Sequence, residues 1–201
     1  MASESGQTEL LGLPVGKRFE ALVSARKPFG LDTSFKGKTV RGSSDLVVYR
    51  NGGRGYTPRS GITAGGTLVD KWKIFIGYAA PGTGNRDTYP HRVISTPFVG
   101  EPGSISSETY LAIGPFETDS EAINALSYLS CRLPRLLIQL RKASQHVTSK
   151  VYSFVPTQDW SRSWTDDALY EKYGLTQDEI EFIEKVVRPM ELQESVDDEA
   201  D

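Results

Sequence analysis

The hydrophobic pattern of the chain changes near Phe116. Before this residue, short runs of β-branched and aromatic residues alternate with clusters such as NGGRG, AGG, PGTGN and EPGS, a pattern typical of strands joined by turns. After it, apolar residues recur three and four positions apart, as in helices. We therefore predict an α+β fold, in which a glycine-loop-rich region of mostly antiparallel or mixed β-sheet precedes C-terminal helices. The predicted strands are residues 46–49, 73–78, 93–99 and 109–113.

The clearest turn in the β region is Asn51-Gly52, which directly follows the segment DLVVYR. A primed two-residue turn needs positive φ at both central residues, and asparagine and glycine tolerate this conformation. The sequence therefore predicts a β-hairpin at this point.

Helical periodicity begins near Asp119 or Ser120, and Pro134 interrupts it. Proline has no amide hydrogen and crowds the carbonyl group four residues earlier, so it is tolerated only in the first turn of a helix. We therefore predict two helices, with Pro134 in the first turn of the second. The predicted core-facing positions are Ile123, Leu126, Leu129, Leu133, Leu136, Leu137 and Leu140.

The second of these helices also carries a polar stripe, roughly 130° from its leucine face. Such a stripe predicts a basic surface that faces away from the core. Its members are Arg132, Arg135, Gln139, Lys142 and His146.

The C-terminal third contains a predicted strand and two short helices. Residues 151–155, VYSFV, are the strand candidate. Thr165 is expected to open a helix that ends near Gly174, and Thr176 with Glu179 forms a capping box for the next helix, which Pro189 stops. The predicted core positions of that last helix are Ile180, Ile183 and Val187.

Length and composition favour one cytoplasmic domain. A chain of 201 residues with 38% hydrophobic and 24% charged residues suits a single core, and no secretion signal or long apolar stretch is present. One cysteine, Cys131, and two histidines cannot supply a disulfide framework or the usual zinc ligands. We expect a flexible segment at 1–18, one domain at 19–190 that is β-rich to 116 and helix-rich from 117, and a disordered acidic tail at 191–201.

The net charge of −3 hides a strong asymmetry along the chain. Residues 165–201 hold 13 acids and 3 bases, so the preceding chain carries a net charge of +7. No acid occurs between Glu121 and Asp159. Such a stretch suits a polyanionic partner, although a solvated basic face balanced by acidic helices gives the same pattern.

No catalytic centre is recognisable in the sequence. No asparagine or aspartate precedes a proline, as adenine methyltransferase motifs require, and no lysine follows an acid by two residues, as in many two-metal nucleases. Residues 77–84, GYAAPGTG, resemble a phosphate loop but are not followed by its lysine and its serine or threonine, and a Gly-x-Ser-x-Gly elbow is absent. Cys131 lies in a leucine-rich pattern and is expected to be a buried apolar residue. We therefore predict no catalytic residues, no metal and no cofactor.

The informative residues that remain are arginines and amides in neighbouring loops. Arginine can bridge two guanine acceptors and asparagine can pair with adenine, while basic helix residues contact phosphates. The predicted base-reading residues are Arg41, Arg50, Arg54, Arg59, Asn85, Arg86, His91 and Arg92, and the predicted phosphate contacts are Arg132, Arg135, Lys142, His146 and Lys150.

Several segments resemble a known family. QHVTSKVYSFVP at 145–156, WTD at 164–166, YGLT at 173–176 and SETYLAIGPFETDSEAINALSYL at 107–129 are similar to the C-terminal, TaqI-like target-recognition region of bacterial adenine-specific DNA methyltransferases of restriction-modification systems. The resemblance covers roughly residues 27–190. It implies sequence-specific recognition of duplex DNA, with methylation, and sometimes cleavage, supplied by another domain or subunit.

Within these motifs, the aromatic residues are expected to build the fold and not to stack on bases. The expected core or helix-packing aromatics are Tyr152, Phe154, Trp160, Trp164, Tyr170 and Tyr173, and 109–111 are expected in a central strand.

Two other functions remain open at this point. The acidic C-terminal helices, with their leucine and isoleucine stripes, could dock onto a methyltransferase or restriction subunit. A hydrolase could use Asp70, Glu101 or Glu108 beside a metal ion, although isolated carboxylates are usually solvated.

Overall fold

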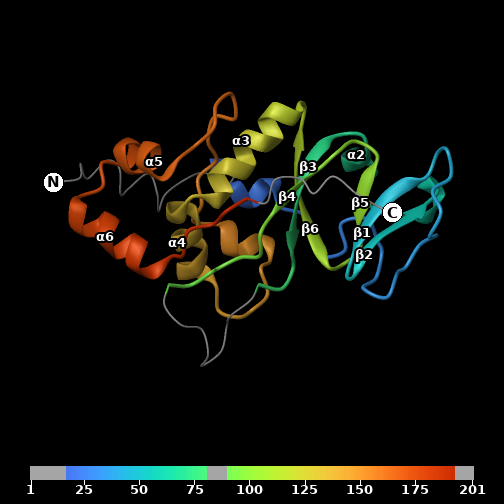
Figure 1. Ribbon diagram of the computed structural model, residues 1–201, viewed down its shortest axis with the longest axis horizontal. Helices are drawn as coiled ribbons and strands as arrows, with labels where there is room; N and C mark the ends of the chain where they lie inside the picture. Colours follow the sequence, from blue (N-terminus) through green and yellow to red (C-terminus); the bar gives the residue numbers. More distant parts are fainter. Residues whose placement is uncertain (1–16, 81–89, 193–201) are drawn as a thin grey trace.

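The structure, a computed structural model, describes residues 17–80 and 90–192 (Figure 1). Most of the predicted flexible N-terminal segment and of the predicted acidic tail lies outside these residues. The described chain has an α+β fold in three layers: a layer of helices, a central three-stranded sheet and a second three-stranded sheet (Figure 1). The predicted fold class is therefore confirmed.

The central sheet is antiparallel and has the order β4-β3-β6. Strand β3 (Trp72–Gly77) lies between β4 (Phe98–Gly100) and β6 (Tyr110–Phe116). The predicted strand at 93–99 is wrong over most of its length, because Val93 adopts φ 66° and pairing begins only at Phe98. Residues 110–111 belong to β6, which is an edge strand of this sheet and not the predicted central one.

The second sheet contains the predicted hairpin. Strand β1 (Leu46–Arg50) pairs antiparallel with β2 (Gly53–Thr57), in a register that places Arg50 opposite Gly53, and parallel with β5 (Ser104–Ser106). The hairpin is confirmed, but its positive φ angles fall at Gly52 and Gly53, one residue later than a primed Asn-Gly turn requires.

Proline and side-chain caps position the two central helices. Helix α3 (Asp119–Ser130) begins at Thr118, whose hydroxyl accepts a hydrogen bond from the Glu121 amide. The chain leaves helical geometry at Cys131, and α4 (Arg132–Arg141) follows with Pro134 in its first turn, as predicted. Two predicted core positions are wrong, since 52% of Ile123 and 65% of Leu140 is exposed.

The C-terminal helices also follow their caps. Helix α5 (Asp166–Tyr173) is capped by Thr165 and ends at Gly174 in the left-handed region, and α6 (Gln177–Val186) begins with the predicted capping box of Thr176 and Glu179. The strand predicted at 151–155 is wrong, because the segment begins within a 3₁₀ turn, η4 (Ser149–Tyr152). The other short elements are η2 (Phe19–Leu22), η3 (Arg59–Gly61) and α2 (Gly66–Val69).

Alternation along β3 divides the interior into two hydrophobic clusters. Ile74 and Ile76 point toward the helices, and Phe75 points toward the second sheet. Tyr152, Trp164 and Tyr170 are buried in the helical cluster, with Trp160 and Tyr173 packed against it and Phe154 half-buried. In the described part of the chain, no helix has the length and apolarity to cross a membrane.

Candidate nucleic-acid interface

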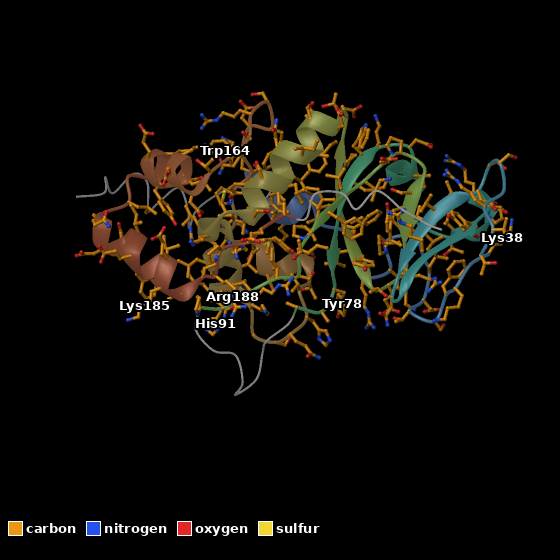
Figure 2. All side chains as sticks on the ribbon, viewed as in Figure 1. Lys38, Tyr78, His91, Trp164, Lys185 and Arg188 are labelled. Carbon is orange, nitrogen blue, oxygen red and sulfur yellow. The ribbon has the colours of Figure 1, made fainter. Side chains whose placement is uncertain are left out.

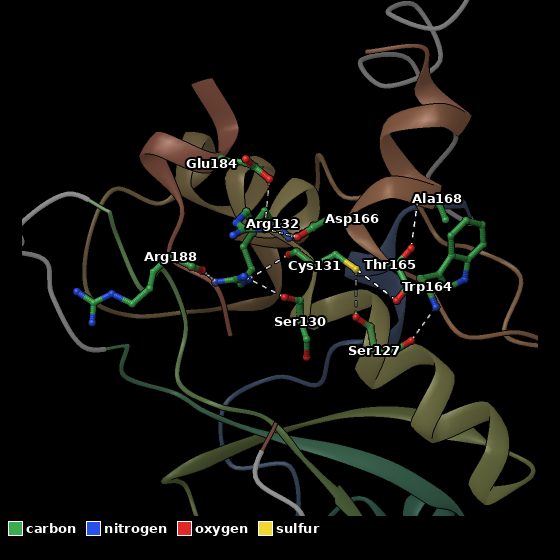
Figure 3. Close-up of polar contacts among 11 residues, drawn as sticks. Ser127, Ser130, Cys131, Arg132, Trp164, Thr165, Asp166, Ala168, Glu184 and Arg188 are labelled. Atoms are coloured by element: carbon green, nitrogen blue, oxygen red, sulfur yellow. Dashed lines mark hydrogen bonds and ion pairs between the residues drawn. The ribbon is translucent and has the colours of Figure 1, made fainter. Parts of the chain in front are cut away.

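Arg135, a predicted phosphate contact, is a core residue. Only 1% of it is exposed, and its guanidinium donates hydrogen bonds to the carbonyl oxygens of Cys131 at 3.1 Å, Ser130 at 2.9 Å and Arg188 at 2.6 Å (Figure 3). Burial lowers the pKa of Arg135 to about 10. The prediction for this residue is wrong, because the donors that a phosphate would need are already used inside the protein.

Two more residues of the polar stripe also hold the fold together. Arg132 Nη1 lies 2.8 Å from a carboxylate oxygen of Asp166 and 3.5 Å from one of Glu184, which joins α4 to α5 and α6 (Figure 3). Lys142 Nζ donates to the carbonyl oxygen of Val93 at 2.7 Å. The stripe is therefore covered by the C-terminal helices over its first half.

His146 and Lys150, the remaining predicted phosphate contacts, lie at a surface groove of about 310 Å³. We call it the Tyr78 groove. Its polar and aromatic lining consists of Tyr78, Arg141, Ser144, His146, Thr148 and Lys150. This lining contains three basic residues and no acidic one.

Backbone hydrogen bonds bring together two chain segments that contribute residues to the Tyr78 groove. The amide of Val147 donates to the carbonyl of Tyr78 at 2.8 Å, and the amide of Ala80 donates to that of Gln145 at 2.9 Å. The segment 145–147 therefore runs beside 78–80. This pairing stacks the His146 imidazole on the Tyr78 ring, with centroids 4.9 Å apart and planes inclined by 21°.

A second basic hollow, the Arg92 groove, has a volume of about 370 Å³ and lies against the end of α6. The amide of His91 donates to the carbonyl of Val186 at 2.7 Å, and the amide of Arg188 donates to that of His91 at 2.9 Å. This pairing brings Arg92 and Arg188 to one site, although they are far apart in the sequence. The groove is lined by Arg92, Thr96, Arg188, Pro189, Met190 and Glu191.

Each groove includes one described residue close in sequence to residues 81–89, Tyr78 before them and Arg92 after them. Figure 2 shows Tyr78, His91, Arg188 and Lys185 along one edge of the molecule. The predicted base readers Asn85 and Arg86 belong to this segment and lie outside the described residues.

Of the other predicted base readers, Arg50 and Arg54 lie in β1 and β2 of the second sheet, Arg59 lies in η3, and Arg41 precedes β1. The second sheet is at the far end of the long axis from α6 (Figure 1). Arg50 donates to the carbonyls of Lys36 and Asn51, and Arg54 lies 5.2 Å from the Tyr49 ring centre. Arg59 is paired with Asp70, while Arg41 is exposed. The structure therefore does not bring all predicted base readers to one surface.

Sequence reasoning did not single out Tyr78, Arg141 or Arg188, which line the two grooves. Arg141 did carry a signal, because it lies in the acid-free stretch. Tyr78 and Arg188 carried none, since only the pairing of 78–80 with 145–147 and of His91 with 186–188 places them beside other basic residues.

The three carboxylates considered for a metal site are each paired with an arginine or exposed to solvent. Asp70 is paired with Arg59, Glu108 with Arg26, and Glu101 is exposed. Within 17–80 and 90–192, no three His, Cys, Asp or Glu side chains gather in a way that could hold a metal ion. Cys131 is buried as predicted, and burial raises the pKa of its thiol to about 12.

Comparisons with protein-family models, with curated proteins and with solved structures give no match to this chain.

Proposed function

We propose that the chain is a sequence-specific duplex DNA recognition domain of a cytoplasmic restriction-modification system, with no methyltransferase or nuclease centre of its own. The observation that supports this function best is that the fold gathers exposed basic side chains into two surface grooves, the Tyr78 groove and the Arg92 groove. Basic side chains in separate grooves can contact several phosphates of a duplex and so fix its position, while other side chains contact the base edges.

The proposed phosphate contacts are exposed cations that the fold brings together. Arg92 and Arg188 are exposed in one groove, and Arg141 and Lys150 in the other. Within the described residues, no hydrogen bond joins these four side chains to a buried carbonyl, in contrast with Arg135. The resemblance of 107–129 and 145–176 to target-recognition regions supports the same partner, and methyl transfer would then come from a separate domain or subunit.

Salt dependence of duplex binding tests the proposal. The protein is titrated against a randomised duplex pool at about 50 to 200 mM salt, where affinity should fall steeply because each neutralised phosphate releases counterions. Lys150→Ala and Arg188→Ala should each reduce the log–log salt slope by about 1 without a change in fold.

Lys71→Ala is the matched control, because Lys71 lies near α2 and pairs with Glu117 away from both grooves. Repeated selection from the pool should enrich a short motif. Absence of salt-dependent affinity for any duplex, or an effect of Lys71→Ala equal to that of Lys150→Ala, would refute the proposal.

A docking function is the second candidate, and one observation favours it. On the acidic helix α6, 57% of Phe182 is exposed. A large exposed aromatic residue surrounded by acids suits a partner with an apolar pocket and a basic rim. Docking is the better description if the wild type binds duplex only when a methyltransferase subunit is added, and if the Phe182→Asp variant does not bind duplex even with that subunit present.

A further inference from the structure

The Tyr78 groove is lined by two stacked aromatic rings, those of Tyr78 and His146. The His146 ring is stacked on the Tyr78 ring with the planes inclined by 21°, and His146 is an exposed residue. Tyr78 is half-buried, and the Arg26 guanidinium lies 4.9 Å from its ring centre, so the Tyr78 ring contacts Arg26 as well as His146. Among the described residues, the exposed His146 ring is therefore accessible to a planar ligand ring that enters the groove.

Cationic and hydroxyl groups line the groove beside these two rings. Arg141 and Lys150 line the groove together with Ser144 and Thr148. The only acid paired with these cations in the described chain is Glu20, whose carboxylate lies 3.7 Å from Lys150 Nζ, and 81% of the Lys150 side chain remains exposed. Lys150 can therefore turn toward an anion in the groove at little cost.

We propose that the Tyr78 groove binds one unpaired nucleotide, with its base stacked on His146 and its phosphate held by Arg141 and Lys150. A volume of about 310 Å³ is in the range of small-ligand sites. The combination of an exposed ring with flanking cations is the one by which proteins hold single-stranded nucleic acid.

This site goes beyond recognition of a duplex. A base inside a duplex is stacked on both faces and cannot be offered to His146, so the ligand is a free nucleotide, a nucleotide at a strand end, or one extruded from the helix. A free nucleotide would bind without any DNA contact. A nucleotide at a strand end or one extruded from the helix would add a contact to an unpaired base to the proposed duplex binding.

Titration with AMP, adenosine and inorganic phosphate tests the site directly. AMP is expected to bind at least tenfold more tightly than adenosine or phosphate alone, because only AMP engages both the ring and the cations. The ring protons of His146 should shift upfield in the NMR spectrum as the adenine stacks on the imidazole.

Three variants and the Lys71→Ala control separate the contribution of the stacking ring from that of the cations. His146→Ala should weaken AMP binding about tenfold and leave phosphate binding unchanged, and His146→Phe should restore AMP binding. Lys150→Ala should weaken the binding of both AMP and phosphate, and Lys71→Ala should change neither. AMP affinity equal to that of phosphate, or unaffected by His146→Ala, would overturn the proposal.

Blunt and overhanging duplexes distinguish the sources and the two proposals. If a one-nucleotide 5′ overhang raises duplex affinity in the wild type but not in His146→Ala, the ligand is a strand end. If AMP binds and neither duplex does, the nucleotide site holds and the proposed duplex recognition fails. If the blunt duplex binds and AMP does not, duplex recognition holds and the nucleotide site fails.

Discussion

Lys73 is a buried lysine, and in the described part of the chain its ammonium group is hydrogen-bonded to carbonyl oxygens and to no carboxylate. Its Nζ donates to the carbonyl oxygens of Ser104 at 2.8 Å, Glu101 at 3.0 Å and Val69 at 3.2 Å. The side chain thereby fastens β3 to the start of β5 and to the end of α2. Burial lowers the pKa of Lys73 to about 8.

This lowered pKa predicts a rise in stability with pH. Above pH 8 the folded protein loses the Lys73 proton, whereas the unfolded chain keeps it up to its ordinary pKa of 10.5. The unfolded state then binds more protons, so the free energy of unfolding should rise across this interval, by at most about 3 kcal/mol. Denaturant titrations between pH 7 and 10 measure the slope.

Lys73→Met is the matched variant for that measurement. Methionine keeps a long unbranched side chain but cannot titrate, so the slope attributable to Lys73 should vanish whatever the variant's absolute stability. Cys131 and the buried tyrosines titrate alike in both proteins and cancel in the difference. Parallel slopes in the two proteins would contradict the assignment.

At the scale of elements, threonine side-chain caps mark where α3, α5 and α6 begin. In the capping box of α6, the Glu179 amide donates to the Thr176 hydroxyl oxygen at 3.4 Å, and the Thr176 amide donates to a Glu179 carboxylate oxygen at 2.8 Å. These contacts satisfy donors that the first helical turn leaves without a partner. The hydrogen bond also lowers the pKa of the Glu179 carboxyl.

Removal of this cap should cost stability without affecting the basic grooves. Thr176→Ala is expected to lower the free energy of unfolding by about 1 kcal/mol, and Thr176→Ser should recover most of the loss. Chemical denaturation followed by circular dichroism measures both. A Thr176→Ser variant no more stable than Thr176→Ala would show that the hydroxyl is not the stabilising group.

At the scale of the whole molecule, the central sheet belongs to two hydrophobic clusters at once. Phe75 lies in the cluster beneath the second sheet, where its ring centre is 5.4 Å from that of Tyr49 and 5.6 Å from that of Phe98. Its neighbours Ile74 and Ile76 face the helices. Because both clusters use the same strand, loss of one should weaken the other.

Phe75→Ala tests this coupling. The cavity is expected to cost about 3 to 5 kcal/mol. The three tryptophans, Trp72, Trp160 and Trp164, all pack in or against the opposite, helical cluster, so their fluorescence reports on the layer that the substitution does not touch. Fluorescence and circular dichroism should give one shared, lowered midpoint; an unshifted fluorescence transition would mean that the two layers unfold independently.

The sequence by itself determined the features that depend on neighbouring residues. The hairpin after Arg50, the break before Pro134 and the ends of α5 and α6 follow from φ preferences, a missing amide hydrogen and capping side chains, all of which act within a few residues. The α+β order of the elements follows from hydrophobic periodicity in the same way.

Only the tertiary structure decided which polar residues meet solvent and which meet each other. Arg135 and Lys150 were equivalent in the sequence, yet α5, α6 and the carbonyl of Arg188 enclose the first and leave the second exposed. Likewise, Tyr78 meets His146, and Arg92 meets Arg188, through backbone pairing between segments far apart in the chain. Burial and long-range pairing depend on what packs against a residue, and neither local conformational preference nor periodicity contains that information.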